Sequence, residues 1–171
     1  MKKQDILENQ VKFSYLALGS NLGNKYQNLE KAKFELEKYK IKIIVSSSNF
    51  LSVSWPDPTK PKFVNLVLKI KTNLSAIKLL KICNFIERKL GRVRSKRNDP
   101  RLCDIDIIDY DHKIIKQDNL ILPHPRMTER NFVLLPLFEI DKSWIHPKSK
   151  TNIVDLISSL TIKDLRSIKQ I

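Results

Sequence analysis

Asp104 and Asp106 stand two residues apart at the start of an apolar run. In an extended strand alternate side chains face the same way, so both carboxylates would project from one surface. Two neighbouring carboxylates can hold a hard divalent cation such as magnesium, whose other positions are filled by water and phosphate oxygens. Taken alone, the pair is more typical of a solvated strand that leads into a polar turn.

A cluster of arginines just before the pair favours phosphate chemistry. Five of the eight arginines lie between residues 88 and 101, whereas the 24 lysines are spread along the chain. The side chains of Arg92, Arg94, Arg97 and Arg101 could bind the oxygens of a polyphosphate. Such a ligand would be held by side chains and metal, because the sequence contains neither a Walker-type phosphate loop nor a dinucleotide fingerprint.

The apolar periodicity predicts an α+β domain around these residues. Strands are expected at 13–18, 41–51, 63–71 and from 104 onward, and helices at 25–39 and 75–90. Asn24 and Ser75 are suited to cap the two helices, and Gly91 to end the second. The order strand, helix, strand, strand, helix, strand is that of a ferredoxin-like βαββαβ core, an antiparallel sheet with helices packed on its faces.

The remaining segments are expected to be less regular. Three prolines make residues 52–62 a loop of restricted flexibility that is long enough to be functional. A hairpin-like stretch follows residue 110. A helix is expected to open at Thr128, and Pro136 would bend or end it. The amphipathic stretch 153–160 is expected to pack on the open face of the sheet.

Length and composition predict an N-terminal extension over residues 1–12 and a single domain over residues 13–171. Cys83 and Cys103 match neither a disulfide framework nor a zinc spacing, so reduced thiols in a cytoplasmic protein are expected. Neither an export signal nor an apolar run of the roughly 20 residues that a membrane helix needs is present in the sequence. The net charge of +14 indicates attraction for anions without identifying the partner.

Five motifs in matching order resemble the hydroxymethyl-dihydropterin pyrophosphokinase family of folate biosynthesis. They are 17–23 (ALGSNLG), 63–65 (FVN), 91–94 (GRVR), 100–101 (PR) with 104–106 (DID), and 123–124 (PH) with Arg130. The resemblance runs from about residue 13 into the C-terminal region. It implies a ferredoxin-like fold, in agreement with the order of the predicted elements. It also implies transfer of diphosphate from ATP to the hydroxymethyl group of 6-hydroxymethyl-7,8-dihydropterin, with release of AMP.

The same resemblance assigns roles to individual residues. It implies two magnesium ions on Asp104 and Asp106, with Arg92, Arg101 and Asp106 as the catalytic residues. The ATP-binding residues would be Asn84, Glu87, Arg92, Arg94, Arg101, His124 and Arg130. The pterin-binding residues would be Ser52, Val53, Trp55, Phe63, Asn65, Asp104, Arg130 and Phe132. Phe63 and Phe132 would stack on the pterin, and Asn65 would read its polar edge.

The chain departs from the family pattern at three places. Asn98-Asp99 stands where the family often has Trp-Gly, and our hypothesis is that Trp55 replaces this aromatic lid over the pterin. Leu102 replaces a common Thr, and Pro125 a frequent Tyr.

Two other classes of function are compatible with parts of the sequence. A basic ferredoxin-like domain could bind RNA, but the aromatic-rich strand of RNA-recognition domains is missing from the sequence. An inactive family member acting as an interaction protein is disfavoured, because Arg92, Arg101, Asp104, Asp106 and His124 are all retained. We therefore expect a monomer that binds small molecules, with neither nucleic acid nor membrane as a partner.

Overall fold

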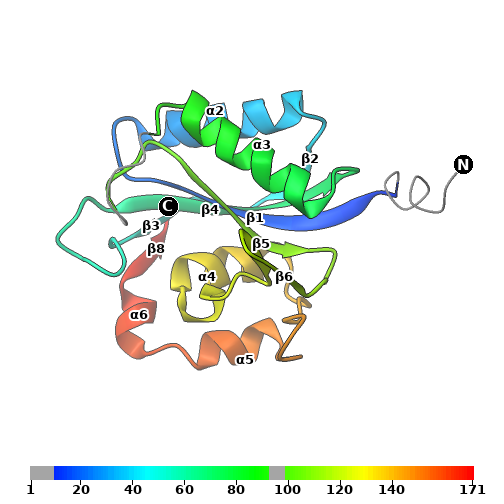
Figure 1. Cartoon of the computed structure of the whole chain (residues 1–171). Helices are drawn as coiled ribbons and strands as arrows, with labels where there is room; N and C mark the ends of the chain where they lie inside the picture. Colours follow the sequence, from blue (N-terminus) through cyan, green and yellow to red (C-terminus); the bar gives the residue numbers. More distant parts are fainter. Residues whose placement is uncertain (1–9, 93–98) are drawn as a thin grey trace, which may run out of the picture.

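The computed structural model describes residues 10–92 and 99–171, and at its centre is a sheet in the order β5-β1-β4-β3-β8 (Figure 1). Its strands are β1 (Lys12–Ser20), β2 (Lys42–Ser46), β3 (Phe50–Ser52), β4 (Phe63–Thr72), β5 (Asp104–Tyr110) and β8 (Ile168–Gln170). All neighbours are antiparallel, and β2 pairs with β4 beside β3. The predicted ferredoxin-like α+β fold is confirmed.

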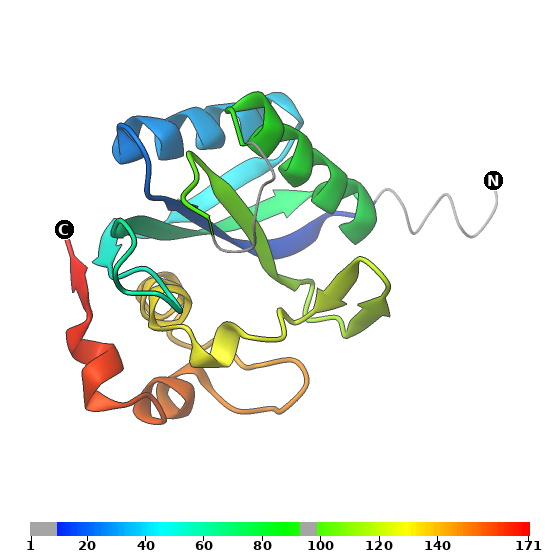
Figure 2. The same ribbon diagram turned by 60° about the vertical axis from the view of Figure 1, so that its left-hand side comes forward.

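Helices cover both faces of this sheet (Figures 1 and 2). One face carries α2 (Lys25–Lys38) and α3 (Ala76–Lys89), and the other carries α4 (Asn131–Ile140), with α5 (Ile153–Ser158) and α6 (Ile162–Arg166) farther out. The two predicted caps are confirmed. Asn24 Oδ1 accepts the backbone N–H of Gln27 at 3.1 Å, and Ser75 Oγ accepts that of Lys78 at 3.4 Å. Gly91 follows α3 with a φ of 91°, a value that favours glycine.

Alternation along the strands separates two hydrophobic cores. In β1, Leu16 and Leu18 belong to the core under α2 and α3, whereas Tyr15 belongs to the core under α4. In β5, Ile105 and Ile107 face α2 and α3. By the same alternation Asp104 and Asp106 must project to the α4 side, as the sequence predicted.

Both cysteines lie in the α2–α3 core. Cys83 and Cys103 are free and fully buried, in agreement with the prediction that they form no disulfide. Burial raises the pKa of both thiols, that of Cys103 to about 12. Both side chains therefore act as small apolar packing residues.

The prediction of one strand over residues 41–51 is wrong, because Ser47 divides this segment into β2 and β3. The N–H of Ser47 donates to Val67 O at 2.9 Å, and its Oγ accepts the N–H of Val67 at 2.9 Å. Beyond this point the N–H of Ser48 turns to the carboxylate of Glu139 at 3.0 Å. The side chains of Ser47 and Glu139 thus take the place of backbone hydrogen-bond partners, and the strand is interrupted between β2 and β3.

The C-terminal part also differs from the predictions. A 3₁₀ turn, η1 (Met127–Glu129), precedes α4, which begins at Asn131 rather than at Thr128. Pro136 lies inside α4 without ending it, because buried Leu134 and Leu137 hold the helix on the core. The stretch 153–160 adds apolar side chains to this core, although α4 lies nearer the sheet.

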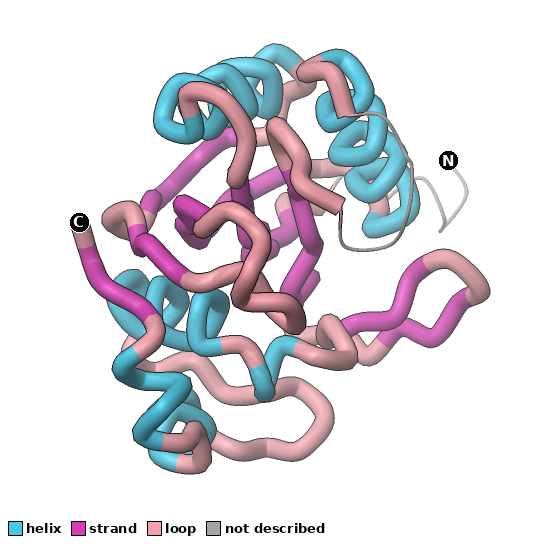
Figure 3. Tube along the Cα trace, turned by 90° about the vertical axis from the view of Figure 1, so that its left-hand side faces the viewer, coloured by secondary structure: helices cyan, strands magenta, loops and turns pink. Residues whose placement is uncertain are grey.

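Two short elements complete the fold. β6 (Ile115–Gln117) and β7 (Leu120–Leu122) form a hairpin, which Figure 3 shows extending from the body. A hairpin-like stretch was expected directly after residue 110, but the chain makes only a tight turn at Asp111 and His112 there, and the hairpin follows it at 115–122. The C-terminal strand β8 was not predicted. A strand of three residues is too short to show the alternation of apolar and polar side chains from which strands are predicted.

Candidate active site

Asp104 and Asp106 begin β5, directly opposite Gly19 and Ala17 of β1. Their side chains are 23% and 36% exposed, so both carboxylates are accessible from solvent. The regular alternation of β5 brings the pair onto one surface, while the intervening Ile105 is buried. The sequence-predicted juxtaposition is present.

Arg92 links Asp104 to a buried glutamate. Its Nη1 lies 2.6 Å from Asp104 Oδ1 and 2.5 Å from Glu87 Oε1. Glu87 Oε1 also accepts the backbone N–H of Ile105 at 2.8 Å, so α3 is joined to β5 at this point. Glu87 is only 3% exposed; burial and the charge of Asp104 raise its pKa to about 7. Burial alone would lower the pKa of Arg92, but Asp104 and Glu87 raise it.

Two further arginines and a histidine surround the pair. Arg101 Nε lies 3.4 Å from Asp104 Oδ2, and Arg130 Nη1 lies 3.0 Å from Asp106 Oδ2. His124 Nε2 lies 3.8 Å from the same oxygen of Asp106. Burial, reinforced by Asp106, raises the pKa of Asp104, whereas burial lowers the pKa of His124. Near neutral pH His124 is therefore uncharged, and guanidinium groups supply the positive charge.

A polar cavity of about 720 Å³ opens on one side of the aspartate pair. Its lining includes the predicted ATP-binding residues that the structure describes: Asn84, Glu87, Arg92, Arg101, His124 and Arg130. The tip of the β6–β7 hairpin contributes Asp118, Asn119 and Ile121. This volume lies within the range of roughly 300–1,000 Å³ that small-molecule sites occupy.

An aromatic cavity of about 50 Å³ opens on the other side of the pair. Its lining includes every predicted pterin-binding residue: Ser52, Val53, Trp55, Phe63, Asn65, Asp104, Arg130 and Phe132. The two cavities share Arg101, Asp104, Asp106 and Arg130. The aspartate pair therefore stands in the wall between a polar chamber and an aromatic one.

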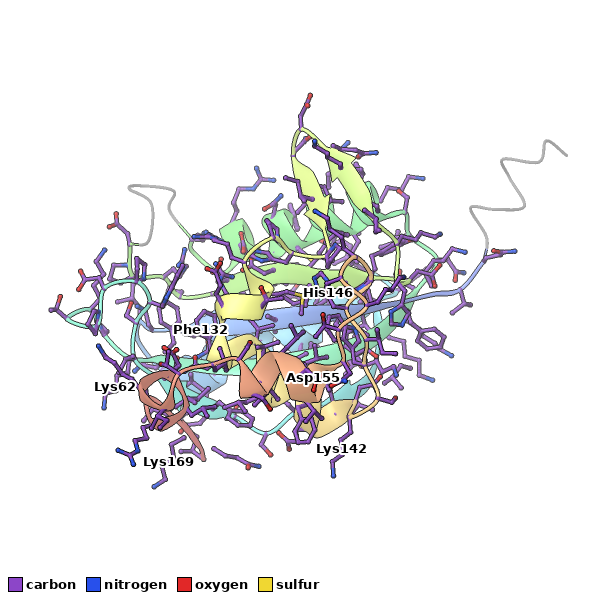
Figure 4. The ribbon with its side chains drawn as sticks, turned by 90° about the horizontal axis from the view of Figure 1, so that it is seen from below. Lys62, Phe132, Lys142, His146, Asp155 and Lys169 are labelled. Atoms are coloured by element: carbon purple, nitrogen blue, oxygen red, sulfur yellow. The ribbon has the colours of Figure 1, made fainter. Side chains whose placement is uncertain are left out.

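Guanidinium groups cover the aromatic rings of the smaller cavity. Arg101 lies 5.7 Å from the ring centre of Phe63, and Arg130 lies 5.5 Å from that of Phe132. Arg130 also lies 5.6 Å from the Trp55 ring. Phe132 is carried by the first turn of α4, on the side of the sheet that faces the viewer in Figure 4.

Two asparagines fix the loops around these cavities. Asn21 exchanges hydrogen bonds with the backbone of Arg101 at 3.1 and 2.7 Å, and its Nδ2 donates to Pro61 O at 3.2 Å. Asn65 Nδ2 donates to Ser52 Oγ at 2.8 Å, which leaves the carbonyl oxygen of Asn65 available to a ligand.

The predicted site residues fall into two groups. All those that the structure describes line one cavity or both. Arg94 and Arg97 lie outside the described residues. Sequence reasoning missed Arg126, whose guanidinium lies 5.4 Å from the Trp55 ring, and Asn21. Asn21 stands inside the 17–23 motif, but its two-way bond to a loop 80 residues away carries no local signal.

Among described residues, no group of three or more His, Cys, Asp or Glu side chains could hold a metal ion. Within the same residues, no helix is long and apolar enough to cross a membrane. Fold and site together define the class: a ferredoxin-like α+β protein with a polar and an aromatic chamber joined at two aspartates.

Comparison with known proteins specifies the family. The family model of 7,8-dihydro-6-hydroxymethylpterin-pyrophosphokinase (HPPK) matches residues 15–142. A 2-amino-4-hydroxy-6-hydroxymethyldihydropteridine pyrophosphokinase of Bacillus subtilis is 39% identical over 131 residues, 74% of this chain and 77% of that protein. The chain belongs to the HPPK family.

Longer proteins are similar as well. The folic acid synthesis protein FOL1 of Dictyostelium discoideum is 46% identical over 135 residues, 78% of this chain but 20% of that protein. The chain thus spans about a fifth of the length of this relative. A crystal structure of a Plasmodium falciparum HPPK-DHPS variant with pteroate matches with a TM-score of 0.74 at 18% identity, covering 95% of this chain and 47% of that one. At this identity the match supports the fold.

Proposed function

We propose that this chain transfers the terminal diphosphate of ATP to the hydroxymethyl oxygen of 6-hydroxymethyl-7,8-dihydropterin, releasing AMP. The position of Asp104 and Asp106 in the wall shared by the two cavities carries the proposal. A polyphosphate in the polar cavity and a flat acceptor in the aromatic cavity would meet at this wall. Membership of the HPPK family supports the same reaction.

The aromatic cavity suits a pterin, which is a flat ring with a polar edge. Phe63 and Phe132 supply ring faces for stacking, and the amide of Asn65 supplies hydrogen-bonding groups at its floor. Asn65 is held by Ser52 and is 5% exposed, so its orientation is fixed before the ligand binds. Preorganisation of this kind reduces the entropy lost on binding.

Two magnesium ions are part of the proposal, with Asp104 and Asp106 as their protein ligands. The residues fit this metal, because the two accessible carboxylates of Asp104 and Asp106 leave most coordination positions to water and phosphate. The bound ions would supply charge neutralisation for the ATP phosphates and orient the acceptor hydroxyl.

The chain's own residues then act by positioning and charge. A bond forms between the pterin hydroxyl oxygen and the β-phosphorus, the bond from that phosphorus to the oxygen of AMP breaks, and the hydroxyl proton is released to solvent. Arg92, Arg101 and His124 line the polar cavity, where the guanidinium groups would neutralise the charge that passes to AMP. One chain lines both cavities, so we propose that a monomer is sufficient.

The test is the formation of AMP from ATP, magnesium and the pterin by the purified protein. AMP distinguishes diphosphate transfer from ordinary phosphoryl transfer, which gives ADP. Asp106→Ala should lower kcat by at least about a hundredfold, since electrostatic groups at a reacting centre typically contribute this much.

Asp111→Ala is the matched control, because Asp111 immediately follows the far end of the same strand and pairs with Lys12 and Lys113. This variant should keep full activity. ADP as the product, or an Asp106→Ala variant as active as the parent, would contradict the proposed function.

A further inference from the structure

The C-terminal segment after residue 151 lies beyond the part of the chain that the family model matches. It nevertheless reaches the aromatic cavity, because β8 pairs with β3, whose last residue is Ser52. In Figure 4, Lys169 of β8 and Phe132 of α4 lie at the same end of the molecule. Residues distant in sequence therefore meet beside the cavity.

A chain of hydrogen bonds joins the two walls of this cavity through the C-terminal segment. Asn131 Nδ2 donates to Ser167 Oγ at 2.9 Å and to Asp164 O at 2.5 Å. Ser167 O in turn accepts the backbone N–H of Val53 at 3.4 Å. The path runs from α4 through the turn before β8 to the residue that follows β3.

Both ends of this path are attached to cavity residues. Asn131 stands between Arg130 and Phe132, which both line the aromatic cavity, and Val53 lines it from the loop after β3. Asn131 itself is not among the lining residues; its side chain is directed to Ser167, and it is only 8% exposed. A buried amide with two donors satisfied by one segment constrains the first turn of α4 strongly.

We propose that Asn131 and Ser167 are positioning residues for the pterin, which set the distance between the Phe132 wall and the Val53 wall. The inference rests on the proposed function, since it names the ligand that fits between these walls. Neither residue touches the acceptor. Their effect should fall mainly on the aromatic cavity, because Phe132 and Val53 line that cavity and not the polar one, whereas Arg130 lines both.

The test is Asn131→Asp, which preserves shape but replaces the donating amide by a carboxylate that faces a carbonyl oxygen. The KM and the directly measured Kd for the pterin should rise about fivefold, since the amide loses its donated hydrogen bonds to Asp164 O and Ser167 Oγ and only part of that loss is transmitted to the cavity. The KM for ATP and kcat should change less than about twofold, because neither Phe132 nor Val53 lines the polar cavity. Ser167→Ala should act in the same direction, and Ser167→Thr, which retains the hydroxyl, should restore affinity.

A double variant shows whether Asn131 and Ser167 affect pterin affinity through their shared contact or independently of each other. If the two side chains act through one contact, Asn131→Asp with Ser167→Ala should be little worse than either single variant. Thr161→Ala is the control, since its hydroxyl caps α6 in the same segment. It should lower the melting temperature and leave the pterin Kd unchanged.

The outcomes distinguish the two proposals. A parent protein that neither binds pterin nor forms AMP overturns the proposed function and this inference with it. A parent that does both, beside an Asn131→Asp variant of unchanged pterin affinity, overturns the inference alone. An equal loss of pterin affinity in Thr161→Ala would also overturn it, because general loosening of the segment would then be the cause.

Discussion

Gly19 lies in β1 opposite both Asn65 and Asp104, where the backbone of the sheet forms part of the aromatic cavity. A Cβ at this position would lie 2.9 Å from Asn65 Oδ1 and 3.4 Å from Phe63 Cδ1. Its φ is not in the left-handed region, so the requirement for glycine arises from the side chains above it. The absence of a side chain at Gly19 lets Asn65 and Phe63 take their places.

Gly19→Ala should therefore impair the acceptor site more than the fold. The methyl group would displace the amide of Asn65, and the KM for the pterin should rise by about tenfold, the equivalent of about 1.4 kcal/mol. The KM for ATP should change little. Steady-state kinetics with each substrate varied in turn measure both values.

Gly23→Ala is a suitable comparison, since Gly23 has a φ of 58° and a methyl group there would meet Leu102 at an ordinary contact distance of 3.6 Å. Backbone strain at this position should lower the free energy of unfolding by about 1 kcal/mol. Its pterin KM should match that of the parent protein. A Gly19→Ala variant with unchanged pterin KM would show that Asn65 does not contact the acceptor.

The proline-rich loop that follows β3 contributes an aromatic side chain to the aromatic cavity from outside the strands and helices. This residue, Trp55, is 38% exposed and lies against the guanidinium groups of Arg126 and Arg130. The aromatic cavity has a volume of about 50 Å³, which is small compared with the roughly 300–1,000 Å³ that small-molecule sites usually occupy. Binding of a bicyclic ring therefore requires the lining to widen; we expect the Trp55 loop to move for this, while Asn21 holds the far end of the loop at Pro61.

The lid hypothesis for Trp55 can be tested with its own fluorescence. The chain has two tryptophans, and Trp144 is fully buried with its Nε1–H donating to Asp109. Pterin should protect Trp55 from acrylamide quenching, whereas a Trp55→Phe variant should show no protection. Trp55→Ala should raise the pterin Kd about fivefold through the loss of stacking and cation–π contact. An unchanged Kd in Trp55→Ala would refute the lid.

Local sequence patterns were sufficient to predict the helices and strands that carry the site residues. They were insufficient to predict the long-range contacts that join these elements. Asn24 and Ser75 cap helices through neighbours three residues away, so their caps could be read directly from the sequence. The break at Ser47 depends on a bond to Val67, and β8 depends on pairing with β3. Such contacts form only in the folded chain, and the link between Asn131 and Ser167 is of the same kind.

Charged groups form part of the site at one end of the molecule and stabilise the fold at the other. At one end, guanidinium and carboxylate groups face each other around the aspartate pair. At the other, Asp141 at the end of α4 accepts hydrogen bonds from Tyr15 of β1 and, at 2.9 Å, from Lys69 of β4. Burial alone would raise the pKa of Asp141, but these hydrogen bonds lower it to about 2. The carboxylate therefore fastens α4 to the centre of the sheet.

This pKa predicts an acid-dependent loss of stability. The folded-state value of about 2 lies below the ordinary value of 3.8, so the stabilisation is complete above pH 3.8 and is lost as the pH falls towards 2. Asp141→Asn should lower the free energy of unfolding by about 1 kcal/mol at pH 7. The difference from the parent should shrink between about pH 4 and 2.

Urea unfolding at about pH 7, 4 and 2.5 measures this difference. Glu30→Gln provides a control, because Glu30 forms an exposed pair with Lys33 and should have little effect at any of these pH values. A difference between Asp141→Asn and the parent that stays constant down to the lowest pH would show that the charge of Asp141 is not the stabilising feature.

Cys103 gives the chain a built-in reporter of motion at its most important strand. It immediately precedes Asp104, is fully buried in the α2–α3 core, and has a pKa raised to about 12 by burial. A thiol-modifying reagent can react there only when β5 separates from the helices above it. In a Cys83→Ala variant, which lacks the other buried thiol of this core, the rate of modification therefore measures how often the strand bearing the two aspartates opens, without any label having to be introduced.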